Sequence, residues 1–393
     1  MKQEILIEFF DRENLENLIS LTKGRYSWVV YLYFPGVNEP SQQVQQTLAR
    51  FIEGRFGIGA EFFPVEEVTL RAICAAFDRI LEDIPSCVID ITGGSEIFSA
   101  AAGYYAAHGK NKMITLQQYD VSRGSLIFRY PRSTATEQPL SLQVPEAVTL
   151  HGAAALDCIP YPGTPELDHE ILRLWSAVKD IPRQWNHFCT MPAFTPAEFR
   201  TLQEKGLVSH SDRNAYDTVA PRLRRKGIMA DETLQRINNK EYRVFSLNVE
   251  PDGRFLYEKG GNLLEMYCAL AAHRSGCFHD CRVSVILDWD GKKRNRTVDV
   301  RNEVDVVVTH GHIPVFISCK NTRLENEHLY EIATMTRHYG GRYARAAIVS
   351  NVENLPVIRK RAQEMGVLLI DEVYKLSLDE FTGIFRTQFP PHR

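Results

Sequence analysis

The sequence predicts an α/β protein in three parts: an N-terminal domain with a parallel sheet at 1–150, a linker and helical connector at 151–240, and a mixed α/β domain at 241–393. At 393 residues the chain is too long for one hydrophobic core, so two domains with a connector are expected. Strand and helix periods alternate in the first part, which indicates βαβ units. The third part has the order α-β-β-β-α-β, in which an antiparallel meander leads into parallel strands.

Short apolar runs in the first part predict strands, and segments with helical spacing follow them. The expected strands are residues 4–10, 28–34, 60–68, 87–94, 112–120 and 125–131, and the expected helices are 12–22, 41–56, 69–83 and 95–109. In open parallel sheets ligands bind beyond the C-terminal ends of the strands. A binding site is therefore expected at that edge.

A stretch rich in Pro, Thr and Ser at 131–165 has the composition of a linker. Helical spacing follows at 169–181, 195–207 and 220–237, and Thr195–Pro196 before Glu198 indicates a helix start. In the third part we expect strands at 241–247, 281–290, 296–310, 313–321, 344–350 and 367–371, and helices at 261–273, 324–340 and 355–366.

Composition is that of an ordinary globular protein, with 44% apolar and 24% charged residues. The net charge of −3 argues against a globally basic, histone-like surface. The sequence has no 18-residue apolar run and no signal-peptide h-region at its start, so no membrane span is expected. Eight cysteines are scattered through the chain, which indicates reduced thiols and a cytoplasmic location.

An acidic residue and a lysine interrupt two apolar runs in NEVDVVVTHGHIPVFISCKN, residues 302–321. Asp305 lies in the first run and Lys320 ends the second, so antiparallel pairing through a turn at THGH brings them to one edge. Glu303 shares the strand face of Asp305, and Glu265 lies in an otherwise apolar helix. Burying a charge costs several kcal/mol unless it is paired or binds a metal, so these residues indicate a site.

This residue set suits phosphodiester hydrolysis. Carboxylates hold a divalent cation that acidifies water, and a lysine orients the water or stabilises charge at phosphorus. Oxygen ligands without a His or Cys cluster favour Mg²⁺ or Mn²⁺ over zinc. The alternative is a cross-strand ion pair between Asp305 and Lys320 without chemistry. Glu331, on the following helix, fits a solvent-facing position.

The hairpin resembles the core of the PD-(D/E)xK restriction-endonuclease-like nucleases. In this resemblance Asp305 matches the first acid, Lys320 the lysine, and Glu265 the acid on the preceding helix. It implies a restriction-endonuclease-like mixed α/β domain at 241–393 and a metal-dependent endonuclease activity.

One position departs from that family pattern. Ser318 stands where the family has Glu or Asp, so either Glu303 or Glu265 supplies the missing charge or the activity is weakened. The resemblance also implies that the backbone carbonyl of Cys319 faces the metal. The metal ligands implied are thus Asp305, Glu265, Glu303 and Cys319, and the catalytic residues are Asp305, Lys320, Glu265, Glu303 and Ser318.

A strand end, a Gly-Gly turn and a helix start follow one another in CVIDITGGSEIFSAAAGYY, residues 87–105. Glycines let backbone N–H groups approach a ligand, and a helix N-terminus favours phosphate. The turn does not match GxGxxG, and no acid ends a second strand about 20 residues on, which argues against a nicotinamide oxidoreductase. A tight turn without a ligand is the alternative.

This stretch resembles the ligand loop of CARF domains, the CRISPR-associated Rossmann-fold sensors of cyclic oligoadenylates, and so implies a Rossmann-like sensor domain at 1–150. Glu96 stands where many members have Lys. The loops Phe10 to Asn14 and Tyr33 to Gly36 lie at the same expected sheet edge, within reach of the adenines. Asp90 opens the matching run, and the ligand-binding residues expected are Phe10, Asp11, Thr92, Gly93, Gly94, Ser95 and Arg123, the last as a phosphate partner.

A sensor of this kind followed by a restriction-type core resembles the CRISPR ancillary nucleases that cyclic tetra-adenylate switches on. The resemblance implies a homodimer that cleaves single-stranded DNA, RNA or both in type III antiviral defence. A cyclic tetranucleotide has two-fold symmetry, which an isologous dimer can read with one loop from each subunit. Ligand closure is then expected to bring the nuclease halves together.

Other readings of the sequence stay open. In a non-enzymatic regulator, the sensor would report to TPAEFRTLQEKGLVSH at 195–210, which would bind DNA as a winged helix. Cys277, His279 and Cys281 share a strand face but lack a second ligand pair for zinc. The basic stretches 222–227 and 292–296 are either solvated or in contact with phosphate.

Overall fold

The structure is a computed structural model, which describes residues 4–21, 25–109, 113–120, 125–137, 140–190, 201–205, 210–237, 240–289 and 300–390. It divides into two compact units, built chiefly from the residues up to Ala154 and from those after it. The residues predicted as a connector, 151–240, therefore belong almost entirely to the second unit.

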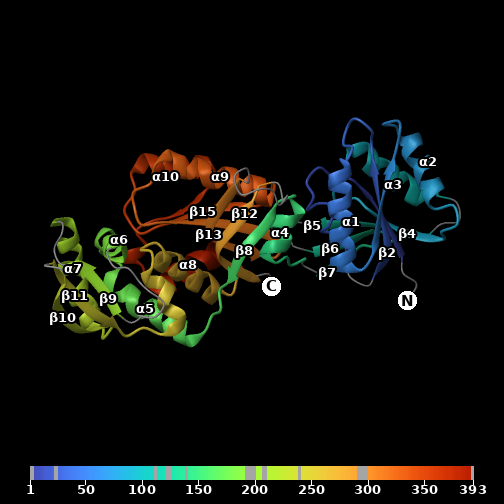
Figure 1. Ribbon diagram of the computed structural model, residues 1–393. Coiled ribbons are helices and arrows are strands. Elements are labelled where there is room, and N and C mark those ends of the chain that lie inside the picture. The colour runs from blue at the N-terminus through green and yellow to red at the C-terminus, as the bar shows by residue number, and fades with distance from the viewer. Residues whose placement is uncertain are drawn as a thin grey trace. The chain divides into compact units, whose positions relative to one another are not determined.

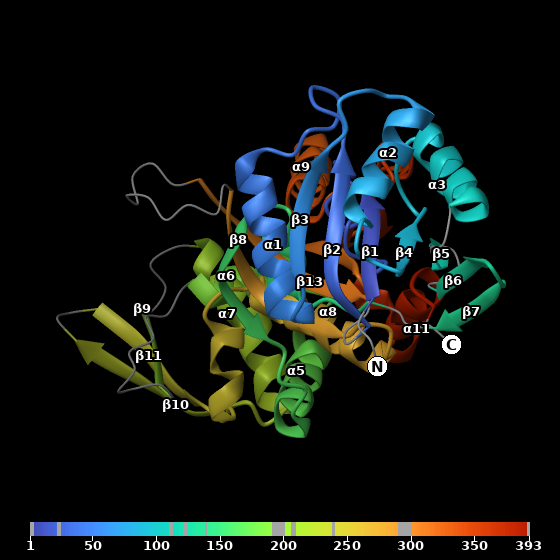
Figure 2. The same cartoon turned by 90° about the vertical axis from the view of Figure 1, so that its right-hand side faces the viewer.

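The first unit is a seven-stranded sheet in the order β3-β2-β1-β4-β5-β6-β7, parallel from β3 to β5 and antiparallel beyond. Helices α2 and α3 lie on one face and α1 on the other, as right-handed crossovers require (Figures 1 and 2). The elements are β1 (Glu4–Phe9), β2 (Tyr26–Tyr33), α1 (Gln42–Phe56), β3 (Gly59–Pro64), α2 (Leu70–Ile80), β4 (Ser86–Asp90), α3 (Glu96–His108), β5 (Met113–Asp120), β6 (Ser125–Tyr130) and β7 (Thr134–Glu137).

The prediction of a helix at 12–22 is wrong, because residues 14–20 form successive turns. Asn17 explains the difference. Its side chain donates to the carbonyl of Asp11 at 2.8 Å and accepts from the Asp11 N–H at 2.8 Å, while its own carbonyl accepts from the Tyr31 hydroxyl. An amide that bonds to nearby backbone offers the chain an alternative to the helix ladder.

The second unit contains a six-stranded sheet in the order β16-β15-β14-β13-β12-β8. Antiparallel β12, β13 and β14 lead into parallel β15 and β16, so the predicted meander is confirmed. Helices α9 and α10 lie on one face, and α8, backed by α11, on the other (Figure 1). The elements are β8 (Ala154–Pro160), α5 (Pro165–Val178), α8 (Asn262–Ser275), β12 (Asp280–Asp288), β13 (Arg301–His310), β14 (Ile313–Lys320), α9 (Asn326–Gly340), β15 (Arg345–Ser350), α10 (Pro356–Glu364), β16 (Leu368–Ile370) and α11 (Leu378–Gln388).

Two of the predicted connector helices are wrong. The described part of the first, Thr201–Lys205, is strand β9, and the second ends at Arg225, beyond which Met229–Ile237 is strand β10. Both pair with β11 (Lys240–Leu247) in a sheet of order β10-β11-β9, so strand pairing overrides their helical propensity. The remaining helices here are α6 (Pro182–Thr190) and α7 (His210–Arg225).

The predicted linker at 131–165 also contains regular structure. It includes β7, helix α4 (Val144–Leu150) and β8, the edge strand of the second sheet. Its Pro and Thr content therefore marks the ends of short elements rather than an extended connection.

Candidate functional site

Asp305 lies where strands β13 and β14 separate. Their ladder runs from His310 opposite Ile313 to Val306 opposite Ile317. Beyond it, Oδ2 of Asp305 accepts hydrogen bonds from the backbone N–H of Cys319 at 2.6 Å and the hydroxyl of Ser318 at 3.2 Å. The carboxylate thus replaces a ladder partner and is fixed in the gap between the strands.

Two more acids and two lysines have charges that influence the ionisation of groups at this gap. Glu265 lies in the first turn of α8. Burial raises its pKa to about 8, with further upward contributions from Asp305 and Glu303, while Lys259 and Lys320 lower it. Charges influence one another in this way only at short range, so the structure brings together the residues predicted from the sequence. Their catalytic roles stay predictions.

A cross-strand ion pair does not account for Asp305. None of the ion pairs between residues that the structure describes joins it to Lys320, and its hydrogen bonds come from Cys319 and Ser318 instead. Burial raises the pKa of Asp305, and the Cys319 N–H and Lys320 partly offset that effect. Ser318 is therefore a hydrogen-bond donor to the acid, not a replacement for it.

The donor atoms suit a hard cation. Within the described ranges, Oδ1 of Asp305 and the carboxylate oxygens of Glu265 and Glu303 take part in no hydrogen bond or ion pair. The same part of the chain contains no three His, Cys, Asp or Glu side chains already gathered at metal-binding distance. The acids therefore fit Mg²⁺ or Mn²⁺ chemically, and a cation would have to draw them together.

Asparagines after the strands hold the edge of this site, and the sequence reasoning missed them. Nδ2 of Asn321 donates to the carbonyl of Gly260 at 3.1 Å, which ties the strand end carrying Lys320 to the start of α8. Gly260 has no room for a side chain, because a Cβ there would lie 2.2 Å from Oδ1 of Asn186. The signal available in the sequence was Asn directly after a predicted strand.

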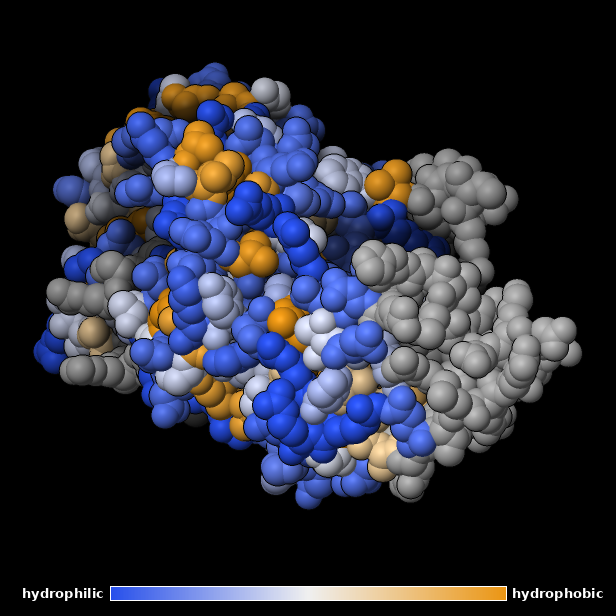
Figure 3. Space-filling model, turned by 90° about the vertical axis from the view of Figure 1, so that its left-hand side faces the viewer, coloured by the Kyte–Doolittle hydropathy of each residue, from blue (hydrophilic) through white to orange (hydrophobic). Residues whose placement is uncertain are grey.

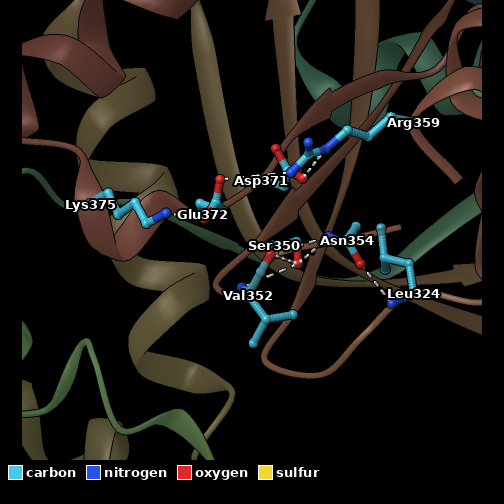
Figure 4. Close-up of polar contacts among 8 residues, drawn as sticks. All are labelled: Leu324, Ser350, Val352, Asn354, Arg359, Asp371, Glu372 and Lys375. Atoms are coloured by element: carbon cyan, nitrogen blue, oxygen red, sulfur yellow. Dashed lines mark hydrogen bonds and ion pairs between the residues drawn. The ribbon is translucent and has the colours of Figure 1, made fainter. Parts of the chain in front are cut away.

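A second asparagine joins the loops after β14 and β15. Oδ1 of Asn354 accepts from the N–H of Leu324 at 2.9 Å, and its Nδ2 donates to the hydroxyl of Ser350 at 3.0 Å (Figure 4). Ser350 stands beside Lys320 in the parallel ladder. The backbone around the lysine is therefore fixed from two sides.

The predicted ligand loop of the first unit follows β4. The N–H of Thr92 donates to Oδ1 of Asp90 at 2.7 Å, and the hydroxyl of Thr92 accepts from the N–H of Tyr119 at 2.7 Å. Gly94 has φ +97°, and a Cβ there would lie 2.9 Å from that of Phe9, so only glycine fits. Ser95 begins α3 without a capping bond, and its buried hydroxyl has no hydrogen-bond partner within the described residues.

The first loop contributes Asp11 rather than Phe10 to this edge. A Cβ on Gly93 would lie 3.9 Å from the Cβ of Asp11, so the two loops are adjacent. Phe10 is 3% exposed, and its ring packs against that of Phe62 with 6.1 Å between the ring centroids. The exposed Arg12, which was not singled out, donates to the carbonyl of Val37 and places a cation in this loop. The predicted phosphate partner Arg123 lies outside the described residues.

Two buried acids lie beneath the ligand loop. Glu8 and Asp90 occupy neighbouring parallel strands, and each has one carboxylate oxygen with no hydrogen-bond partner in the described part of the chain. Burial raises the pKa of Asp90 to about 6, against hydrogen bonds from Thr92 that lower it. Burial and the charge of Asp90 raise the pKa of Glu8 as well.

The weaker motifs gain no support as sites. Cys277 and Cys281 are buried, and Nδ1 of His279 accepts from the N–H of Gly311 at 3.0 Å, which leaves no zinc cluster in the ranges described. Glu331 is exposed on α9. The basic stretch 292–296 lies outside the described residues, and none of the described helices is long and apolar enough to span a bilayer.

Comparisons with known proteins agree with this fold. Residues 252–380 match the Card1-like, endonuclease domain family. The solved structure of VC1899 from Vibrio cholerae is similar over 98% of both chains, with a TM-score of 0.73 and 16% identity. Can2 from Sulfobacillus thermosulfidooxidans, solved in complex with cyclic tetra-adenylate, is similar over 98% of this chain and 97% of its own, with a TM-score of 0.67 and 15% identity. No curated protein matches the chain.

These findings confirm the predicted α/β fold class. They also confirm the predicted resemblance at the level of the fold, since the whole chain has the fold of Can2 and residues 252–380 match an endonuclease domain family. Over residues 252–380 the C-terminal part of the chain thus resembles the Card1-like endonuclease domains.

Proposed function

We propose that this protein is a metal-dependent nuclease that cleaves single-stranded DNA, RNA or both when a cyclic oligoadenylate binds its first unit, as part of type III CRISPR antiviral defence. One observation carries the proposal: Glu265, Glu303, Asp305 and Lys320 act on one another where β13 and β14 separate, inside a domain of the Card1-like endonuclease family. Acids with free oxygens beside a lysine, at a strand edge partly open to solvent, are the groups that phosphodiester hydrolysis needs.

The cation would be held by Asp305 through Oδ1, with Glu265 and Glu303. When bound, Mg²⁺ or Mn²⁺ supplies Lewis-acid stabilisation of the phosphate oxygens and makes a nearby water more acidic. The carbonyl of Cys319 is expected to face the same gap, because the N–H and C=O of one strand residue point to the same side and its N–H reaches Asp305.

The chain's own groups have distinct tasks in this proposal. Ser318 and the Cys319 N–H hold Oδ2 of Asp305, which leaves Oδ1 without a hydrogen-bond partner among the described residues. The ammonium of Lys320 offsets negative charge that develops at phosphorus or orients the attacking water. Asn321 ties the strand end carrying that lysine to the start of α8, and Asn354 joins the loops after β14 and β15.

The activator is expected to be cyclic tetra-adenylate, since the similarly folded Can2 was solved with that ligand. Support from this chain is the ligand loop itself: a glycine without room for a side chain, a helix start, and the unpartnered hydroxyl of Ser95. A homodimer would present two such loops to a two-fold symmetric ring.

Cleavage of end-labelled single strands tests the proposal. We expect DNA or RNA to be degraded with Mn²⁺ or Mg²⁺ plus cyclic tetra-adenylate, and little cleavage when chelator replaces the metal or when the ring is omitted. Rings of three and six adenylates check the size preference. Tight ring binding without cleavage under any metal would overturn the nuclease and leave a sensor alone.

A further inference from the structure

The geometry points to a phosphate-binding hollow, formed by the C-terminal ends of α5 and α7, that holds the backbone of the substrate strand. This inference rests on the proposed nuclease function. The hollow has a volume of about 520 Å³ and is lined by Ser176, Ala177, Arg222, Arg225 and Lys226. Three of its five lining residues are cations and none is an acid.

Only part of this positive charge is used within the protein. Arg222 donates to Oδ1 of Asp180 at 2.6 Å and to the carbonyl of Ala177 at 3.3 Å, which fixes its guanidinium on the wall. Arg225 and Lys226 are exposed, and neither has an ion pair within the residues that the structure describes. Cations at a helix C-terminus are stabilised by the helix dipole, but this does not explain why two stay unpaired around a hollow.

The hollow lies close to the candidate active site along one short path. Ala177, on its wall, is two residues from Lys179, whose carbonyl accepts a hydrogen bond of 2.8 Å from Nδ2 of Asn351. The N–H of Asn351 in turn donates to the carbonyl of Lys320 at 3.0 Å. Two helical residues span about 3 Å, so a strand bound at the hollow would reach the active edge within a few nucleotides.

The surroundings favour a nucleic acid over an apolar partner. Figure 3 views the molecule from the side on which α7 lies and shows a mainly hydrophilic face, with hydrophobic residues in small separate groups. A basic groove that follows the backbone is the common feature of proteins that bind single strands without sequence preference.

Strand binding by the full-length Asp305→Asn protein tests the hollow without cleavage. The probes are labelled 20-nucleotide single strands of mixed sequence, one of DNA and one of RNA, titrated over a range of salt concentrations. We expect Arg225→Glu with Lys226→Glu to weaken strand binding by about tenfold or more and to lower the slope of log affinity against log salt by about 1.4, since each phosphate contact to a single strand contributes about 0.7. Arg225→Gln with Lys226→Gln should give a smaller change in the same direction.

Lys360→Glu is the matched control, because Lys360 is an exposed cation on α10, away from the hollow. If the double variant Arg225→Glu with Lys226→Glu loses no more affinity than this control, the hollow is not the strand-binding site. Unchanged cyclic tetra-adenylate binding and unfolding temperature show that the double variant is folded. If the wild-type protein binds strands through Arg225 and Lys226 but never cleaves them, the nuclease proposal fails while the hollow stands.

Discussion

Both units place acids side by side, but one pair is fully buried and the other group is partly open to solvent. In the first, Glu8 and Asp90 are 2% and 1% exposed, and no cation is among the groups that act on Glu8. In the second, Glu303 is exposed, Glu265 and Asp305 are partly buried, and Lys259 and Lys320 lower the pKa of Glu265.

This difference separates two uses of the same chemistry. Desolvation raises the pKa of acids in both places, to about 6 for Asp90 and to about 8 for Glu265. Acids at a partly open edge beside lysines can exchange the proton for a metal ion. The neighbouring lysines and the exposed Glu303, rather than residue type or burial alone, therefore distinguish the candidate cation site from the buried pair.

The largest expected effect breaks the open site. Asp305→Asn keeps an oxygen that can accept from the Cys319 N–H but removes the charge, so we expect cleavage to fall by at least about 10³-fold. Affinity for cyclic tetra-adenylate should not change. The measurement is the single-turnover rate on a labelled strand. Glu331→Gln, an exposed acid of the same domain, is the control and should cleave normally.

How far the sequence predicts this site follows from the range of the forces involved. Apolar runs located the strands carrying Asp305 and Lys320, and the Gly-Gly stretch located the turn between β4 and α3, because both are local patterns. The contact of Asn321 with Gly260 joins residues 61 positions apart, and no local pattern marks it. The strands β9 and β10 were missed for the same reason, since their pairing with β11 outweighs helical propensity.

The next largest effect is on the pH dependence of stability, and it tests the buried pair Glu8 and Asp90. Asp90 has a pKa of about 6 in the folded protein and about 3.8 when unfolded, so between those values only the folded state holds the proton. The free energy of unfolding should therefore fall as pH rises from about 4 to about 6, by up to about 3 kcal/mol. Asp90→Asn retains the acceptor for Thr92 and should raise the unfolding temperature at pH 7.5 more than at pH 4.5.

An exposed acid of the same unit provides the control for that prediction. Asp83→Asn lies at the surface and should leave the unfolding temperature nearly unchanged at both pH values. A gain for Asp90→Asn that is equal at pH 4.5 and pH 7.5 would contradict a buried acid with a raised pKa.

Two serines at helix starts allow a test of ligand binding by the first unit. The hydroxyl of Ser95 is buried and makes no cap bond, whereas Oγ of Ser41 accepts from the N–H of Val44 at 3.3 Å. Ser95→Ala should leave stability unchanged or slightly higher and weaken cyclic tetra-adenylate binding by about tenfold, the worth of one hydrogen bond to a charged group. Ser41→Ala should cost about 1 kcal/mol of stability with no loss of binding. Calorimetry gives both quantities, and equal binding by the two variants would remove Ser95 from the ligand site.

The smallest expected effect concerns the link between the two halves of the open site. Asn321→Ala removes the donor to the Gly260 carbonyl, so the strand end carrying Lys320 and the helix carrying Glu265 are held together less firmly. Asn262→Ala removes a comparable bond to the carbonyl of Phe255 at the same helix start, 2.7 Å long, that does not reach the strand. Both changes should cost about 1 kcal/mol of stability. Only Asn321→Ala should also lower the cleavage rate a few-fold and raise the Mn²⁺ concentration needed for half-maximal rate, because only that bond fixes the distance between lysine and acid. Identical kinetics for the two variants would mean that Asn321 only stabilises the helix start and does not position Lys320.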